Sequence, residues 1–336
     1  MTRSDTAVPV TRASRVRLLT GTVLRGVGRN SSTPLLAVVC STLATFWFLL
    51  RDTAFISPNN LLNVVQANAP VCVMAVATVF VISAGEIDLS FASVIPLAAY
   101  VAALLLRWDQ ALIVAVLGGL GVGACVGLIN GLITVGLRMP SFIVTLGMIG
   151  VAQGASQWIT RTQAVPVVDT AFATVFGAGS LGPVPVLAFW TVAVGALGYV
   201  LLNRMPFGKA VLATGGNPTA AGYSGIRVSR VKVTVLVMSG LSGALAGLLY
   251  AGRLQGARYD LGADDLLTTL AAVIIGGTAL SGGRGRVIGA IFGALLMGFL
   301  NNGLILLGLD VPQQLMFRGA IIVIAVALSA RGSVRR

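Results

Sequence analysis

The chain of 336 residues has no histidine, only three cysteines, and charged side chains at only 10% of its positions. Histidine is the commonest general base and metal ligand in proteins, so its absence argues against hydrolytic or zinc chemistry. The cysteines (Cys40, Cys72 and Cys125) lie in apolar runs without metal-ligand spacing, which indicates small buried hydrophobic residues. Soluble domains carry about 25% charged residues. We therefore expect neither a catalytic site nor a metal or cofactor, and we do not expect a soluble protein.

Nucleotide-binding signatures are also missing. No segment matches Gly-x-x-x-x-Gly-Lys-Ser/Thr, the loop whose backbone and lysine bind phosphate groups. The glycine-rich run 276–285 has no lysine and lies in an apolar region. We therefore expect that the chain hydrolyses no ATP by itself.

Long apolar runs are what the sequence has in abundance. Hydrophobic residues make up 56% of the chain and the mean hydropathy is +0.94, which predicts an all-α, polytopic membrane protein. The net charge of +13 lies in loops and tails rather than on one face, which fits membrane orientation and argues against nucleic-acid binding. About ten runs can cross a lipid bilayer: 34–51, 62–83, 91–107, 111–137, 141–158, 187–203, 231–251, 266–281, 286–307 and 314–330.

Charge sets the expected orientation, because Lys and Arg near the ends of spans stay in the cytosol. With both termini inside, 17 of 23 basic residues fall on the cytoplasmic side and seven of ten acids fall outside. These 17 are the six arginines before residue 30, Arg138, the five basic residues of 203–232, Arg284, Arg286, Arg331, Arg335 and Arg336. We expect a basic cytoplasmic tail at 1–33, a transmembrane domain at 34–330 and a cytoplasmic tail at 331–336. The longest external connection, 159–186, should carry a short interfacial helix.

The segment 203–232 is the only long polar interruption with a net positive charge. Its centre is predicted to form a short capped helix, because Asn217 can accept first-turn N–H groups, Pro218 suits the first helical position, and Gly225 suits the position after the last turn. Such a helix displayed in the cytosol indicates a docking site for a partner. The residues expected to form it are Asn217, Pro218, Thr219, Ala220, Ala221, Ser224 and Gly225, with the two alanines at the closest approach of the surfaces.

The segment 85–90, Gly-Glu-Ile-Asp-Leu-Ser, interrupts an apolar stretch. Acids at membrane depth are costly and usually face protein or water. Glu86, Asp88 and Ser90 are therefore candidates to line a translocation path on a broken helix. In the alternative interpretation, Asp88 or Ser90 caps the following helix and Glu86 pairs with a cytoplasmic arginine.

Three amides in apolar spans, Asn130, Asn301 and Asn302, are further candidates for the path, with interhelical hydrogen bonding as their alternative role. They belong to a faint internal echo between Gly-Leu-Ile-Asn-Gly at 127–131 and Gly-Phe-Leu-Asn-Asn-Gly at 298–303. The echo falls in the fourth and ninth expected spans, which run in opposite directions. A five-plus-five inverted repeat predicts this correspondence, and chance similarity is the alternative.

Four motifs in order resemble the sugar-type ABC importer permeases, the family of the ribose, xylose and galactoside permeases. They are the segment 85–90, the segment 130–148 with its Arg-Met-Pro-Ser sequence, the loop 207–226, and the glycine-rich run 275–285 followed by Asn-Asn-Gly at 301–303. The resemblance spans about residues 60 to 330. Glu86 stands where the family usually has glycine, and Thr219 stands where its loop often has an acid.

This resemblance implies a multi-pass permease subunit in the bacterial cytoplasmic membrane. A second permease, alike or homologous, would complete the pathway, two cytoplasmic ATPase domains would bind the helix at 217–225, and an external binding protein would deliver a sugar. The rival class is an ion-gradient-driven secondary transporter of a small polar solute. Such a transporter would need a buried ionisable pair or cation site at mid-membrane, for which Glu86 and Asp88 are the candidates.

Overall fold

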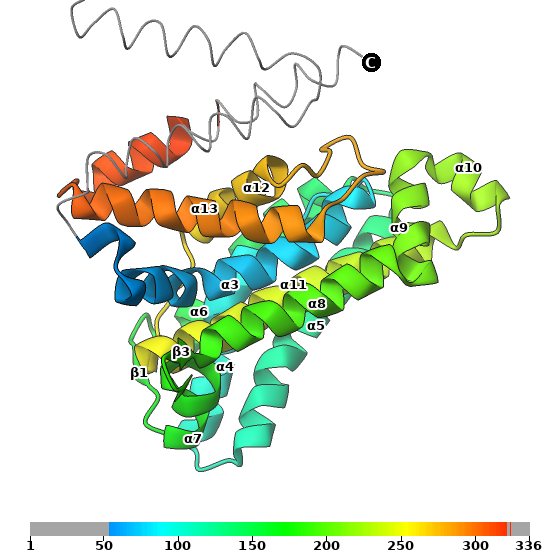
Figure 1. Cartoon of the computed structure of the whole chain (residues 1–336). Helices are drawn as coiled ribbons and strands as arrows, with labels where there is room; N and C mark the ends of the chain where they lie inside the picture. The colour runs from blue at the N-terminus through cyan, green and yellow to red at the C-terminus, as the bar shows by residue number, and fades with distance from the viewer. Residues whose placement is uncertain (1–53, 321–322, 324–336) are drawn as a thin grey trace, which may run out of the picture.

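The computed structural model describes residues 54–320 and residue 323. The predicted first span (34–51), both predicted tails and the last part of the predicted tenth span lie outside these residues. Figure 1 shows the described chain as a bundle of long helices, with α9 and α10 at one end and the short strands with α7 at the other.

Helices make up most of the described structure. The long helices are α3 (Pro58–Ser83), α4 (Phe91–Arg107), α5 (Leu112–Gly136), α6 (Ser141–Thr160), α8 (Val186–Asn203), α11 (Val228–Leu254) and α13 (Val287–Leu306). The shorter ones are η1 (Ala54–Ile56), α7 (Thr170–Ala173), η2 (Thr174–Ala178), α9 (Pro206–Gly216), α10 (Pro218–Tyr223) and α12 (Asp265–Ile275), and residues 311–320 are also helical. Two-residue strands pair antiparallel, β1 (Val165–Pro166) with β4 (Gly256–Ala257) and β2 (Ser180–Leu181) with β3 (Val184–Pro185). The predicted all-α class is confirmed apart from these strands.

Within the part of the chain that the structure describes, six helices are long and apolar enough to cross a membrane, namely α3, α5, α6, α8, α11 and α13. Helices α4 and α12 are apolar but shorter. The predicted span 266–281 is wrong, because α12 ends at Ile275 after 11 residues. At about 1.5 Å per residue such a helix covers about half of a hydrocarbon core. The helix ends because Gly277, directly after the cap residue, adopts a φ of +88°, a conformation that glycine adopts without strain, and its N–H donates to the carbonyl of Ile274.

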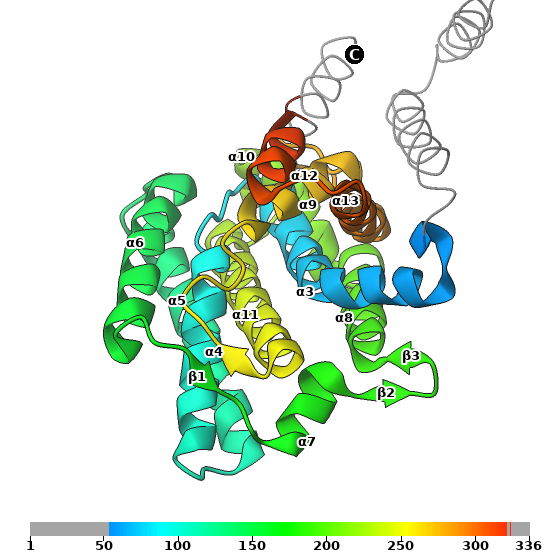
Figure 2. The same cartoon turned by 90° about the vertical axis from the view of Figure 1, so that its left-hand side faces the viewer.

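Helix α11 lies at the centre of the bundle. Figure 2 shows α4, α5 and α6 on one side of α11, and α3, α8 and α13 on the other. Contacts follow this arrangement, since α11 packs against α5, α4 and α3, while α3 packs against α13, α8 and α12. The hydrophobic core therefore runs along α3 and α11, whose long stretches are the most deeply buried of the six long helices.

Small residues let α5 and α11 approach closely. A Cβ added at Gly123 would lie 2.3 Å from the carbonyl oxygen of Gly240, and one added at Gly127 would lie 2.4 Å from that of Leu236. Close backbone contact of this kind replaces the hydrophobic drive that is missing between helices in lipid. Helices α5 and α13 also run in opposite directions along the bundle (Figure 1), as the inverted repeat requires, and the repeat itself stays a prediction.

The apolar stretch in the loop 159–186 packs inwards. Asp169 caps α7 by accepting a hydrogen bond from the backbone N–H of Phe172 (2.6 Å). Phe172 and Phe176 are buried, their ring centroids lie 5.0 Å apart, and the ring of Trp190 lies 5.4 Å from that of Phe176. A short helix in this loop is confirmed, but its interfacial role is not, because its aromatic side chains contact their own chain instead of a membrane surface.

The two ends of the bundle differ in charge. At the end that carries α10, here called the α10 end, the connections, the short helix α9 and the helix ends hold eight basic residues and two acids. They are Arg138, Arg204, Lys209, Arg227, Arg230, Lys232, Arg284 and Arg286, with Glu86 and Asp88. The opposite end, here called the hairpin end after β2 and β3, holds five basic residues and six acids. They are Arg107, Arg161, Arg253, Arg258 and Arg318, with Asp109, Asp169, Asp260, Asp264, Asp265 and Asp310.

Candidate functional site

The short helix α10 forms as the sequence predicts. The Oδ1 atom of Asn217 accepts a hydrogen bond from the backbone N–H of Ala220 (3.0 Å), and Pro218 occupies the first helical position. After the last turn, Gly225 has a φ of +83° and its N–H donates to the carbonyl of Gly222. The N–H of residue 226 then donates to the carbonyl of residue 221, which completes a Schellman motif. The predicted capped helix is confirmed.

One side of α10 is free and the other packs on the chain. Pro218, Thr219, Ala220, Ser224 and Gly225 are exposed. Ala221 is only 4% exposed, so the expectation that it meets a partner surface is wrong, and its side chain instead holds α10 against its own chain.

Sequence reasoning missed the largest side chain on α10. Tyr223 is 89% exposed, the highest value among the exposed large hydrophobic residues of the described chain. Tyrosine is enriched among the residues that dominate protein–protein binding energy. A signal was present in the sequence, since Tyr223 is the only aromatic residue between Asn217 and Gly225.

Helix α9, which precedes α10, packs against the end of α3. A Cβ added at Gly215 would lie 1.9 Å from the carbonyl oxygen of Ser83, so no side chain fits there. The same carbonyl accepts a hydrogen bond from the backbone N–H of Gly283 (3.0 Å). The end of α3 is therefore held between α9 and the glycine-rich connection 276–286.

The segment 84–90, which joins α3 to α4, is held by side chains from two neighbouring helices. The Nζ atom of Lys232 in α11 lies 2.5 Å from Oε1 of Glu86, whose side chain is 6% exposed. The backbone N–H of Ile87 donates to Oγ of Ser141 (3.0 Å), and that of Leu89 donates to Oγ1 of Thr145 (3.2 Å). The alternative that Glu86 pairs with an arginine is wrong, because its partner is a lysine.

Asp88, Ser90 and Asn130 form one buried hydrogen-bonded group. Oδ1 of Asp88 accepts from the backbone N–H and from Oγ of Ser90, both at 2.7 Å. The Nδ2 atom of Asn130 donates to Oγ of Ser90 (2.8 Å), which confirms an interhelical hydrogen bond between α5 and the start of α4. Ser90 occupies the N-cap position of α4 without a side-chain capping bond, so the predicted capping by Ser90 is wrong.

A cavity of about 560 Å³ opens at the α10 end beside the segment 84–90, and Asp88, Ser90 and Asn130 do not line it. Glu86 and Lys232 lie on its wall, together with Thr134, whose buried Oγ1 has no hydrogen-bond partner within the described residues. The remaining lining residues are Gly85, Ile87, Val135, Arg138, Met139, Pro140, Ser141, Phe142, Val228 and Ser229. The cavity therefore has both charges and hydroxyl groups on its surface.

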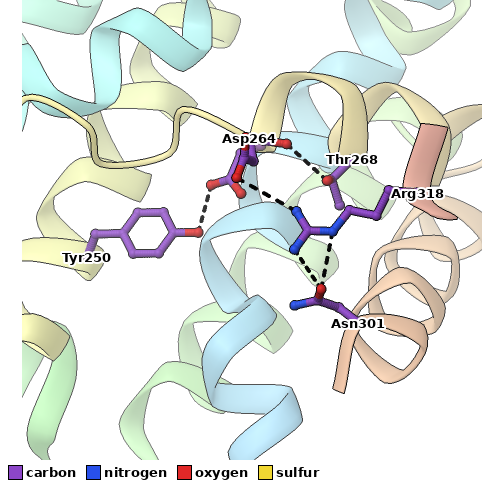
Figure 3. Close-up of polar contacts among 6 residues, drawn as sticks. Tyr250, Asp264, Thr268, Asn301 and Arg318 are labelled. Carbon is purple, nitrogen blue, oxygen red and sulfur yellow. Dashed lines mark hydrogen bonds and ion pairs between the residues drawn. The ribbon is translucent and has the colours of Figure 1, made fainter. Parts of the chain in front are cut away.

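The other two candidate amides lie near the hairpin end, away from the group around Asp88. Asn302 exchanges two hydrogen bonds with Asn60 of α3 (2.8 and 3.1 Å). Oδ1 of Asn301 accepts from Nε and Nη2 of Arg318 (3.2 and 2.6 Å), as Figure 3 shows. The structure thus divides the predicted pathway residues into two groups instead of bringing them together.

Arg318 links three segments at the hairpin end. Besides Asn301 of α13, its Nη1 atom lies 4.0 Å from Oδ2 of Asp264, just before α12. The neighbouring Asp265 accepts a hydrogen bond from the Tyr250 hydroxyl of α11 (2.6 Å; Figure 3). The partner of Arg318, which the sequence left open, is this mixed amide and carboxylate group.

Two exposed charged side chains, Arg258 and Asp260, also form an ion pair at the hairpin end. Nε of Arg258 donates to Oδ1 of Asp260 (3.0 Å), and this hydrogen bond holds the pKa of the Asp260 carboxyl below its ordinary value. Within the described residues, no three His, Cys, Asp or Glu side chains lie close enough together to hold a metal ion.

Comparison with known proteins assigns the chain to a family. The family of permease components of branched-chain amino acid transport systems matches residues 60–326. The chain belongs to this family. The ribose import permease protein RbsC of Escherichia coli K12 is 35% identical over 296 residues, which cover 87% of this chain and 89% of that protein. The RbsC protein of Bacillus subtilis is 38% identical over 285 residues, covering 84% and 88%.

A third relative is named for a different sugar. The L-arabinose ABC transporter permease protein AraH of Azospirillum brasilense is 32% identical over 308 residues, covering 91% of this chain and 88% of that protein. The resemblance to sugar-type ABC importer permeases is thereby confirmed. No solved structure matches the chain.

Proposed function

We propose that this chain is the membrane subunit of an ATP-driven importer that carries a sugar or sugar-like solute. The observation that carries the proposal is the likeness along most of the chain to permeases named for ribose and L-arabinose. The apolar helices supply the membrane-spanning body, and the capped helix α10 supplies a surface outside it. A monosaccharide is the solute class that these relatives favour.

In this proposal the α10 end faces the cytosol and both termini lie there too. The excess of basic residues at this end supports that orientation, because Lys and Arg near span ends resist translocation. The domain boundaries expected from the sequence then apply, with a cytoplasmic tail at 1–33, a transmembrane domain at 34–330 and a tail at 331–336. The segment 159–186 faces outwards, where a binding protein delivers the solute, and a second permease completes the pathway.

The exposed side of α10 is the proposed docking surface for a cytoplasmic ATPase. Helices commonly bind by laying one side in a groove of the partner. Tyr223 is the anchor in this arrangement because it is fully displayed, while Thr219, Ala220 and Ser224 line the same exposed side. Asn217, Pro218 and Gly225 hold the helix in shape through their caps, and buried Ala221 fixes it to the chain.

The group around Asp88 is the proposed cytoplasmic part of the pathway. Glu86, Asp88, Ser90 and Asn130 surround the break between α3 and α4 beside the cavity, whereas Asn301 and Asn302 belong to the opposite end. The ion-gradient alternative is less well supported, because Glu86 already has Lys232 as its counter-ion and is not free to hold a cation.

The docking surface can be tested with the Tyr223→Ala variant. We expect the variant to be made and inserted normally, because Tyr223 contacts solvent, but to lose at least about tenfold in affinity for the ATPase, as dominant interface tyrosines do. Sugar uptake into proteoliposomes containing the ATPase and the binding protein should fall in parallel, and the purified chain alone should hydrolyse no ATP. Val168→Ala, which removes an equally exposed side chain at the hairpin end, is the control.

Normal ATPase binding by the Tyr223→Ala variant would show that α10 is not the docking surface. Sugar uptake by the wild-type chain without ATP, driven by a proton or sodium gradient, would contradict the importer class itself.

A further inference from the structure

The ion pair between Glu86 and Lys232 joins two segments with different proposed tasks. Lys232 lies near the start of α11, directly after the connection that contains α10, and its side chain is 30% exposed. Glu86 lies in the segment 84–90 and is almost completely buried. A carboxylate at such a place requires a counter-charge, so the position of the loop depends on the position of α11.

The same loop is also contacted from the other side of α10. Gly215, two residues before the cap of α10, lies against the carbonyl of Ser83 at the end of α3. The Cα atom of Gly215 is also the nearest neighbour of a Cβ placed on Gly85 (3.5 Å). Both flanks of α10 therefore touch the segment that joins α3 to α4, one by backbone packing and one by the ion pair.

Beyond this segment, the contacts lead into the helices that border the cavity. Backbone N–H groups of Ile87 and Leu89 are bound by Ser141 and Thr145 of α6. The side chain of Ser90 is bound by Asn130 of α5. A displacement of the segment 84–90 therefore acts on α5 and α6 through these three hydrogen bonds.

We propose that the Glu86–Lys232 ion pair is a positioning link that transmits movement of α10 to the segment 84–90 and from there to α5 and α6. The inference rests on the proposed function, since it requires an ATPase that moves α10. Glutamate stands here where the resembling permeases usually have glycine, which has no side chain to bind a lysine.

If the ion pair served only to stabilise the fold, the variants would be expected to behave differently. Replacing both members of a buried pair by neutral residues often costs little stability, whereas removing one member leaves an unpaired charge and costs much more. If the pair serves stability alone, the double variant should recover what each single variant loses. If the pair transmits movement, the double variant stays as defective as the single ones because the connection is still absent.

The variants are Glu86→Gln, Lys232→Met and the two combined, each assembled with the ATPase and the binding protein in proteoliposomes. The measured quantity is the number of sugar molecules imported for each ATP hydrolysed. We expect each variant to lower this ratio by about fivefold or more, the size of an ordinary coupling between sites. The combined variant should be no worse than the single ones, and Lys232→Arg should keep most of the ratio because it keeps the charge.

Arg107→Met is the control, because it removes an exposed charge at the far end of α4 and should leave the ratio unchanged. A wild-type ratio in the combined variant would overturn the proposal and leave the pair a structural one. Failure of the proposed function looks different, because the wild-type assembly would then import no sugar on addition of ATP.

Discussion

Gly215 offers the sharpest test of how α9 and α10 are attached to the membrane bundle. A methyl group at this position would meet the carbonyl oxygen of Ser83 at 1.9 Å, so the two segments must separate by about 1 Å to accept Gly215→Ala. Overpacking of this kind costs about 1–3 kcal/mol. Gly216 is the matched control, since it occupies the next position in α9 and a methyl group there would find its nearest neighbour at 3.9 Å.

The two substitutions should therefore act in opposite directions. Replacing a helical glycine by alanine where space is free stabilises by about 0.5–1 kcal/mol. The expected difference between the variants is about 1.5–4 kcal/mol, with Gly215→Ala the less stable. Thermal unfolding of the purified full chain in detergent measures it, and the two midpoints should differ by at least about 2 °C.

Sugar import for each ATP hydrolysed gives the second readout for this pair of variants. Gly215→Ala should lower that ratio because it displaces α9 from the end of α3, whereas Gly216→Ala should leave it unchanged. Equal stability of the two variants would refute the close contact between Gly215 and Ser83, and with it the attachment of α10 described above.

Two further outcomes are expected. The first concerns orientation and uses a chain whose three cysteines are replaced by serine. In intact cells a membrane-impermeant maleimide should label the added cysteine of Val168→Cys but not that of Tyr223→Cys. Labelling of Tyr223→Cys alone would mean that the proposed orientation is inverted. Arg318→Lys should lower stability by about 0.5–1.5 kcal/mol, because a lysine cannot reproduce both hydrogen bonds to Asn301, and Arg318→Met should lower it further. Thermal unfolding measures the stability of these variants, with Met316→Ala as the control because Met316 is exposed. An unchanged unfolding midpoint in Arg318→Met would show that the hydrogen bonds of Arg318 contribute nothing to stability.

Sequence reasoning succeeded where a residue type dictates its own local geometry. Asn217 and Gly225 identified both ends of α10 because few other residues accept first-turn N–H groups or adopt positive φ without strain.

It failed where the answer lies in a distant part of the chain. Nothing near Glu86 identifies Lys232 as its partner, and nothing near Ala221 shows that its side chain packs inwards. The span predicted at 266–281 failed for a different reason. Hydropathy recognised the apolar residues but did not register that Gly277, with its positive φ, ends the helix early.

The hydrogen bonds between Asn60 and Asn302 have a consequence for how the protein is made. Asn60 belongs to the first described long helix, whose opening turns also contain Asn59, Asn63, Gln66 and Asn68, and its partner follows 242 residues later. During synthesis α3 is made before α13 exists, so Asn60 has no Asn302 to bind until the end of α13 has been made. A chain that ends before residue 302 therefore lacks the two hydrogen bonds that tie the first turns of α3 to the last turns of α13.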